Sequence, residues 1–188
     1  MMLDLQPNLA HPALSLRPAT PADWPALSTA AGDPGIWAGH PAHDRWQLPV
    51  FRAFFDEGLA SGGMLVAVEP GGTIIGSSRF DFGRAGPAEV EVGWSFLVRR
   101  HWGGTSNHIM KALMVGHALQ AVERVIFLIG DTNIRSRTAI TRIGASPLPG
   151  RQITAQLSTG PVVHLTHAID RAGFAAGPLV PLWAQRII

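Results

Sequence analysis

The chain has 188 residues, 46% of them hydrophobic, and a formal net charge of +2 at pH 7. This length and composition fit one folded domain and exclude an intrinsically disordered chain. Fourteen arginines and a single lysine, Lys111, are scattered along the chain rather than gathered in a basic cluster, which argues against a nucleic-acid partner.

The chain contains neither cysteine nor tyrosine. Disulfides, thiolate metal sites and a cysteine nucleophile are therefore excluded. The eight histidines show no metal-ligand spacing, so we expect no metal site. No apolar run approaches the roughly 18 residues of a membrane span, and residues 1–12 lack the pattern of a secretory signal. We expect a cytoplasmic protein without a membrane partner.

Apolar residues alternate in the segments that predict strands and recur at helical spacing in those that predict helices. Thr20 and Pro21 have the residue types of a helix start, and Pro70-Gly71-Gly72 predicts a hairpin turn. In chain order, the predicted elements are a strand at 14–17, a helix start at 20–23, an irregular stretch at 32–49, a helix at 50–59, hairpin strands at 64–69 and 73–80, a strand at 88–98, a helix from 106, a strand at 125–129, a helix at 135–143, and strands at 152–157 and 162–169.

This order of elements predicts a mixed α/β domain built around one twisted sheet. We expect the domain to span residues 14–170, with an N-terminal tail at 1–13 and a C-terminal extension at 171–188.

The connection between the strand at 88–98 and the following helix is the clearest candidate site. Gly103 and Gly104 allow a ligand to approach the backbone, and unpaired N–H groups at a helix N-terminus attract anions. Arg99 or Arg100 can add a charge-assisted contact. The segment predicts a phosphate or pyrophosphate site, although the pattern also fits an ordinary strand-to-helix connection. It matches neither of the two common nucleotide fingerprints.

Three motifs in the same order resemble the GNAT superfamily of N-acetyltransferases. The cofactor loop of that superfamily follows Arg/Gln-x-x-Gly-x-Gly/Ala, which residues 100–105 (RHWGGT) match except at Thr105. One branch, similar to ribosomal-protein N-terminal acetyltransferases, has motifs matched by residues 91–94 (EVGW) and 107–114 (NHIMKALM). Its later motif, from an Asn to a Gly-Ala pair, is matched by residues 133–145. The resemblance covers about residues 14–170.

The resemblance implies a mostly antiparallel twisted sheet, flanked by helices, whose central parallel strands splay apart. It implies that acetyl-CoA lies in the opening between the strands ending near Val98 and Ile129, with a β-bulge near Trp94–Phe96. Backbone groups of Leu97 and Val98 are implied to pair with the pantetheine arm and to polarise the thioester carbonyl. The remaining residues implied to hold the cofactor are Arg99, Arg100, Trp102, Gly103, Gly104, Thr105, Ser106, Asn107, Asn133 and Ser136. Both asparagines also have the residue type of a helix cap.

The resemblance further implies transfer of an acetyl group to a primary amine by direct attack in a ternary complex. A base must first take a proton from the amine, and Glu91 is the candidate, acting through water. Ser136 matches a serine proposed to hydrogen-bond the cofactor sulfur. Many relatives use a tyrosine as the acid, and His167 lies near its expected place and can titrate near neutral pH. A salt-bridged carboxylate, a first-turn serine and a structural histidine are the respective alternatives.

The acceptor is expected to be a small-molecule amine or a protein N-terminus. Trp37 and Trp46, in the irregular stretch, are candidate walls of its site, and core packing is the alternative for each. Glu89 lies on the same strand face as Glu91, so this pair could bind a cationic acceptor. Similar proteins commonly form homodimers. The missing tyrosine and Thr105 leave a second hypothesis, an acyl-CoA-binding module of the same fold with little or no catalysis.

Overall fold

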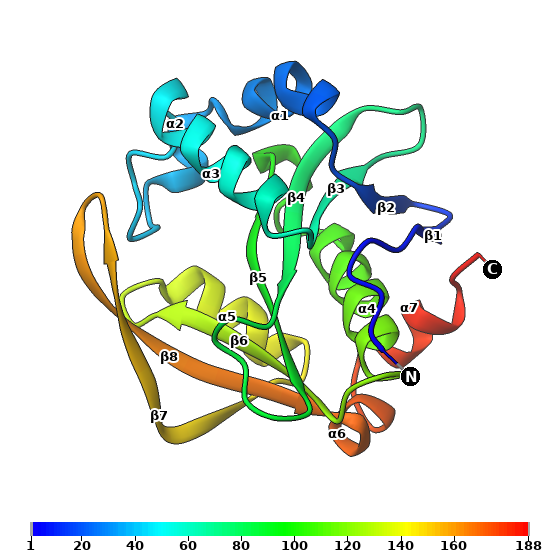
Figure 1. The fold of residues 1–188 in the computed structure, drawn as a ribbon. Coiled ribbons are helices and arrows are strands. Elements are labelled where there is room, and N and C mark those ends of the chain that lie inside the picture. Colours follow the sequence, from blue (N-terminus) through cyan, green and yellow to red (C-terminus); the bar gives the residue numbers. More distant parts are fainter. Residues whose placement is uncertain (1, 188) are drawn as a thin grey trace.

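An eight-stranded sheet runs through the protein in the order β1-β2-β3-β4-β5-β6-β8-β7 (Figure 1). The computed structural model describes residues 2–187. The strands are β1 (Leu9–His11), β2 (Leu14–Pro18), β3 (Met64–Val68), β4 (Ile74–Asp81), β5 (Glu89–Leu97), β6 (Arg124–Gly130), β7 (Ser146–Leu157) and β8 (Gly160–Asp170). The helices are η1 (Pro21–Asp23), α1 (Trp24–Ala31), α2 (Pro34–Trp37), α3 (Leu48–Ala60), η2 (Arg99–His101), α4 (Ser106–Ala118), α5 (Ile134–Arg142), α6 (Arg171–Ala175) and α7 (Val180–Ala184).

Neighbouring strands are antiparallel except for β5 and β6, which are parallel. This confirms the predicted mixed sheet with a central parallel pair. Helices α4 and α5 share a core with one face of the sheet, and α1, α2 and α3 share a second core with the other face (Figure 1). None of the helices within residues 2–187 is long and apolar enough to cross a membrane.

The parallel strands β5 and β6 are paired over only three residues, from Glu89 opposite Arg124 to Glu91 opposite Ile126. Beyond this point β5 continues along β4, and β6 continues along β8. The two central strands therefore diverge toward their carboxyl ends. An opening in the middle of a sheet exposes backbone polar groups and side chains from both strands, which makes it a natural place for a ligand.

A bulge in β5 accompanies this divergence. Ser77 of β4 lies opposite Phe96 and Arg79 opposite Gly93, so β5 has one more residue than β4 between these pairs. Trp94, within the extra segment, has a φ of 51°, a left-handed conformation that is unusual for a bulky residue. The bulge also reverses the alternation of side chains, so that Phe96 packs in the core formed with α1 to α3. This confirms the bulge expected near Trp94–Phe96.

The indole of Trp94 is held between two guanidinium groups. The Arg79 guanidinium carbon lies 3.5 Å from the ring centroid, and that of Arg84 lies 4.5 Å from it. Cations stack favourably on the electron-rich face of an indole. These contacts help to offset the cost of the strained backbone at Trp94.

Three segments carry structure that the sequence patterns did not predict. Within the irregular stretch, Pro34–Trp37 forms the short helix α2, which Asp33 caps by accepting a hydrogen bond from the Gly35 amide. The expected tail contributes β1, which pairs with β2. The expected extension contributes α7, whose Trp183 lies against Gly116 of α4. These elements have five residues or fewer, too short for a periodic pattern to show.

The bulge leads to a prediction about Gly76, the β4 residue opposite Leu97. A Cβ atom added at Gly76 would lie 2.0 Å from the Phe96 carbonyl oxygen, whereas one added at Gly39 would meet no atom within 4 Å. Because backbone cannot yield as a flexible side chain does, Gly76→Ala should lower the free energy of unfolding by about 1–3 kcal/mol. Gly39→Ala is the control. Denaturant unfolding checks this, and equal stability of the two variants would contradict the described pairing of β4 with β5.

Candidate active site

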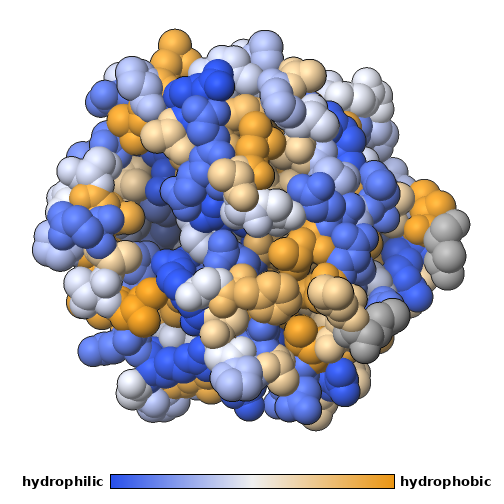
Figure 2. Space-filling model, viewed as in Figure 1, coloured by the Kyte–Doolittle hydropathy of each residue, from blue (hydrophilic) through white to orange (hydrophobic). Residues whose placement is uncertain are grey.

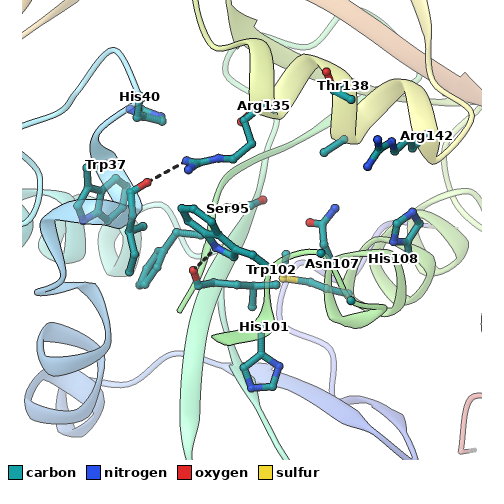
Figure 3. A pocket seen from close by; sticks show the side chains of 18 residues that line it. Trp37, His40, Ser95, His101, Trp102, Asn107, His108, Arg135, Thr138 and Arg142 are labelled. Atoms are coloured by element: carbon teal, nitrogen blue, oxygen red, sulfur yellow. Dashed lines mark hydrogen bonds between the residues drawn. The ribbon is translucent and has the colours of Figure 1, made fainter. Parts of the chain in front are cut away.

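Two adjoining cavities lie where β5 and β6 diverge. The large cavity, of about 370 Å³, is bounded by α2, the end of β5, the loop before α4, and α5 (Figure 3). The small cavity, of about 150 Å³, is bounded by the bulge of β5, the end of β6, and the segment that precedes α3. The residues that line both cavities are His40, Ser95, Asn107, Ser136 and Ala139. These residues mark the junction of the cavities.

The loop before α4 presents backbone donors to the large cavity. Within residues 2–187, none of the backbone N–H groups from Gly103 to His108 donates a hydrogen bond. A Cβ atom added at Gly104 would meet no atom within 4 Å, so the backbone is open to a ligand there. Free N–H groups and the positive end of a helix dipole together suit a phosphate group. Three residues of this segment line the large cavity: Gly103, Gly104 and Asn107. The anion-site hypothesis requires such a position.

The two arginines of this loop are engaged with carboxylates rather than directed into the cavity. Arg99 donates to Asp33 beside α2, and Arg100 donates to Glu69 in the β3–β4 turn. His101 lines the large cavity, and its ring contacts the same Glu69 (Figure 3). These contacts fix the loop in place. The predicted residues Val98, Arg99, Arg100, Thr105 and Ser106 line neither cavity.

A stacked pair of side chains crosses one wall of the large cavity. The Trp102 indole donates a hydrogen bond of 2.8 Å to the Leu97 carbonyl oxygen. The Arg135 guanidinium lies 4.0 Å from the centroid of that indole and donates to the Ile36 carbonyl at 2.8 Å (Figure 3). Leu97 was predicted to offer its backbone to the pantetheine arm, and the structure shows that its carbonyl already accepts from Trp102.

His40 lies at the junction of the cavities and holds no positive charge at neutral pH. Burial and the nearby charge of Arg45 lower its pKa from 6.5 to about 3. Its Nδ1 accepts a hydrogen bond from the Ala42 amide, which leaves the proton on Nε2. His40 can therefore donate a hydrogen bond within the site but cannot act as its base. No motif pointed to His40, because its place depends on how α2 packs against β5.

The two asparagines and the serine of the predicted motifs come together here. Asn107 and Ser136 line both cavities, and Asn133 lines the small one. The Asn133 side chain accepts a hydrogen bond from the Ser136 amide at 3.2 Å, so it caps α5. The cap holds the first turn of α5, and with it Ser136, at the mouth of the diverging strands.

Lys111 is a buried cation that sequence reasoning did not single out. It lies on α4, and its ammonium group reaches Ser95 of β5 and donates a hydrogen bond to the Ser95 hydroxyl. No carboxylate within residues 2–187 lies within 4 Å of it. Burial lowers its pKa from 10.5 to about 7. The one available signal was a lysine among the apolar residues that recur along this helix.

The predicted carboxylates are both bound by arginines. Glu91 accepts two hydrogen bonds from Arg84, and burial, partly offset by that arginine, raises its pKa to about 7. The Glu91 carboxylate lies beside Gly93, a residue that lines the small cavity. A Cβ atom added at Gly93 would lie 2.8 Å from Glu91 Oε1. Glu89 is bound by Arg151 and Arg124 and lines neither cavity. The Arg151 contact holds its pKa below the usual value.

Two other predicted residues lie away from the cavities. His167 is buried in β8 opposite Phe127, whereas His164, three residues earlier, lines the small cavity. Because strand side chains alternate, these histidines point to opposite faces of the sheet. Trp46 is 41% exposed and lines neither cavity. Trp37 is buried, lines the large cavity and donates a hydrogen bond to the Ala31 carbonyl.

A family model described as the acetyltransferase (GNAT) domain matches residues 13–146. The chain belongs to the GNAT acetyltransferase family. The sequence resemblance to this superfamily is thereby confirmed, and the chain is an acyltransferase by family. A search of curated protein sequences found no match. The cavities at the diverging strands are accordingly the candidate active site of this acetyltransferase.

Solved structures of acetyltransferases share this fold. A GCN5-related N-acetyltransferase from Brucella melitensis has a TM-score of 0.79 at 11% identity, covering 95% of this chain and 83% of its own. Mycobacterium smegmatis RimJ, solved with CoA-disulfide, has a TM-score of 0.68 at 17% identity, covering 96% and 94%. A GNAT-family acetyltransferase from Bacillus anthracis has a TM-score of 0.69 at 14% identity, covering 87% and 98%. At these identities the likeness establishes the fold.

Several polar side chains meet at the junction of the cavities. In the part of the chain that the structure describes, no three His, Asp or Glu side chains gather as metal ligands would. The groups at the junction are instead a neutral imidazole, two hydroxyls and an amide, with Lys111 beside them. Such groups can donate hydrogen bonds and hold a proton near neutral pH.

Lys111 leads to a prediction about stability and pH. Its pKa is lowered from 10.5 in the unfolded chain to about 7 in the fold, so between these values the unfolded chain binds more protons. Below pH 7 the buried charge lowers the free energy of unfolding by its whole desolvation cost. This loss of stability disappears as the pH rises toward 10. Lys111→Met should therefore be more stable than wild type at pH 6, with a difference that shrinks by pH 9. Thermal unfolding of both proteins across this range checks it, and a constant difference would contradict it.

Proposed function

We propose that this GNAT acetyltransferase transfers the acetyl group of acetyl-CoA to a primary amine by direct attack in a ternary complex. The observation that carries the proposal is the junction of two cavities at the diverging strands, with the free N–H groups of residues 103–108 beside one of them. Two substrates can then meet at the junction from separate cavities. The same proposal assigns the enzyme to the cytoplasm, as expected from the sequence.

The large cavity fits the requirements of acetyl-CoA. The amides from Gly103 to His108 would hold the pyrophosphate, because they are unpaired and lie at the positive end of α4. The end of β5, at Leu97 and Val98, would pair with the pantetheine arm. The Leu97 carbonyl has a second lone pair available beside the Trp102 bond, so both contacts are compatible.

The junction residues supply the roles that the reaction needs. The amine nitrogen bonds to the thioester carbonyl carbon, the carbon–sulfur bond breaks, and the amine must lose a proton. Glu91, with a pKa near 7, would take that proton through water beside Gly93. Ser136 would donate a hydrogen bond to the departing thiolate, and the Nε2–H of His40 is a further donor at the same junction. His167 is left without a role because it lines neither cavity.

We infer that the chain belongs to the branch similar to ribosomal-protein N-terminal acetyltransferases. The motifs at residues 91–94, 107–114 and 133–145 support this. The likeness in fold to RimJ, whose structure holds CoA-disulfide, is consistent with the branch and with a CoA cofactor.

Gly104 provides a test of cofactor binding. In Gly104→Val the branched side chain would cover the unpaired amides, while an added Cβ meets nothing in the folded protein. The variant should keep the melting temperature of the ligand-free protein but bind CoA about tenfold to a hundredfold more weakly, as loss of one or two hydrogen bonds to phosphate implies. Thermal shift with a CoA titration checks this. Undiminished CoA affinity would contradict the assigned pyrophosphate site.

Glu91 provides a test of catalysis. Glu91→Gln should lower kcat by about a hundredfold, the lower range for loss of a general base, while KM for acetyl-CoA stays unchanged. Asp56→Asn is the control, because Asp56 also pairs with an arginine but on the exposed surface of α3. Thiol release from acetyl-CoA with a panel of amines measures both. If CoA binds and no amine gives thiol release in the wild type, the protein is an acyl-CoA-binding module instead.

A further inference from the structure

Within residues 2–187, the small cavity is lined by two basic side chains and by no carboxylate. Arg45 and Lys111 line it together with the histidines His40 and His164, and its other polar lining residues are neutral. The carboxylates nearest on β5, Glu89 and Glu91, are bound by arginines and lie outside it. A cationic acceptor, considered from the sequence because of these two glutamates, would meet the positive charge of Arg45 here, which Asp44 and Glu57 offset in part without forming an ion pair with it.

The Arg45 guanidinium has no hydrogen-bond acceptor among residues 2–187. Its guanidinium carbon lies 4.7 Å from the ring centroid of Phe54 and 5.4 Å from that of Trp37, and these two rings hold it in place. Among residues 2–187 it has no ion pair within 4 Å and no side-chain hydrogen bond. Burial lowers its pKa only to about 10, so it stays charged at neutral pH. A pre-positioned guanidinium with free donors is the protein group best suited to bind a carboxylate.

Lys111 provides the second positive group, near the junction at Ser95. A buried ammonium without a carboxylate is costly, and an anion in the same cavity would reduce that cost. The molecular surface is hollowed between the β7–β8 hairpin and the segment before α3, and the side chains in the hollow are hydrophilic (Figure 2).

We propose that the acceptor is a small amine that also carries a carboxylate, such as a free amino acid, with its carboxylate bound by Arg45 in the small cavity. The amine then extends to the junction at Ser95 and Ser136, where the large cavity begins. This inference rests on the proposed acetyl transfer and narrows the acceptor to one chemical class. The neutral imidazole of His40 adds no like charge where the amine must bind, and the positive charge of Lys111, at Ser95, favours the uncharged form of the amine that attacks the thioester.

The test compares matched acceptors in the thiol-release assay. Amino acids with the amine at the α, β or γ position are compared with the amides and the decarboxylated amines of the same skeletons. Carboxylate acceptors should have at least a tenfold higher kcat/KM than their matched amides. Arg45→Met should raise KM for the carboxylate acceptors by about tenfold to a hundredfold and leave the amides unchanged, because it removes a charge-assisted contact. Arg45→Lys should restore part of the preference.

Arg52→Met is the matched control. Arg52 also stacks on an aromatic ring, with its guanidinium carbon 4.9 Å from the centroid of Trp24, but it lies on the surface of α3 and lines neither cavity. It should leave the preference unchanged. The melting temperature of each variant is measured to show that the protein is folded.

Binding is measured separately, by thermal shift with each acceptor in the presence of saturating CoA. A carboxylate-dependent shift that Arg45→Met abolishes supports the anion site even if no thiol is released, in which case the proposed transfer fails and the site stands. Equal shifts and equal rates for carboxylates and amides overturn the proposal. An equal loss for all acceptors in Arg45→Met also overturns it, because Arg45 would then only support the fold.

Discussion

The divergence of β5 from β6 is the constraint on which the rest of the site depends. The bulge at Trp94 bends β5 away, and the stacking of Trp94 between Arg79 and Arg84 holds that bend. Two consequences follow. The sheet opens, so that cavities can form on either side of one junction. The side-chain alternation reverses, so that Glu91 and Phe96 lie on the same face although they are five positions apart, an odd spacing that places side chains on opposite faces of a regular strand.

Arginine is the residue that organises charge around this opening. Arg84, Arg124 and Arg151 neutralise the two strand glutamates, and Arg99 and Arg100 bind acids that anchor the loop before α4. With these carboxylates engaged, positive charge predominates in the small cavity. Most of the other guanidinium groups also make local contacts, with carboxylates, backbone carbonyls or aromatic rings.

Much of the fold could be predicted from the sequence, because its main elements carry strong periodic signals. The alternation in β5 and the apolar recurrence in α4 set the strand and the helix that flank the loop at Gly103 and Gly104. The short elements β1, α2 and α7 could not be predicted, because their stability comes from pairing or packing with distant segments. His167 was expected near the site from its position in the chain, yet it lines neither cavity, whereas His164, on the other face of the same strand, lines the small one.

The sequence by itself determined the family, the loop that offers free amides at the start of α4, and the order of elements that brings residues 91–94, 100–105 and 133–136 to one place. These properties depend on local residue types and spacing, which a sequence displays directly. Only the tertiary structure decided that Glu89 is neutralised by arginines, that His40 and Lys111 reach the junction, and that Arg45 finds no acceptor in the described part of the chain. Charge balance in a cavity depends on which distant side chains meet there, and that is set by packing across the sheet rather than by any local pattern.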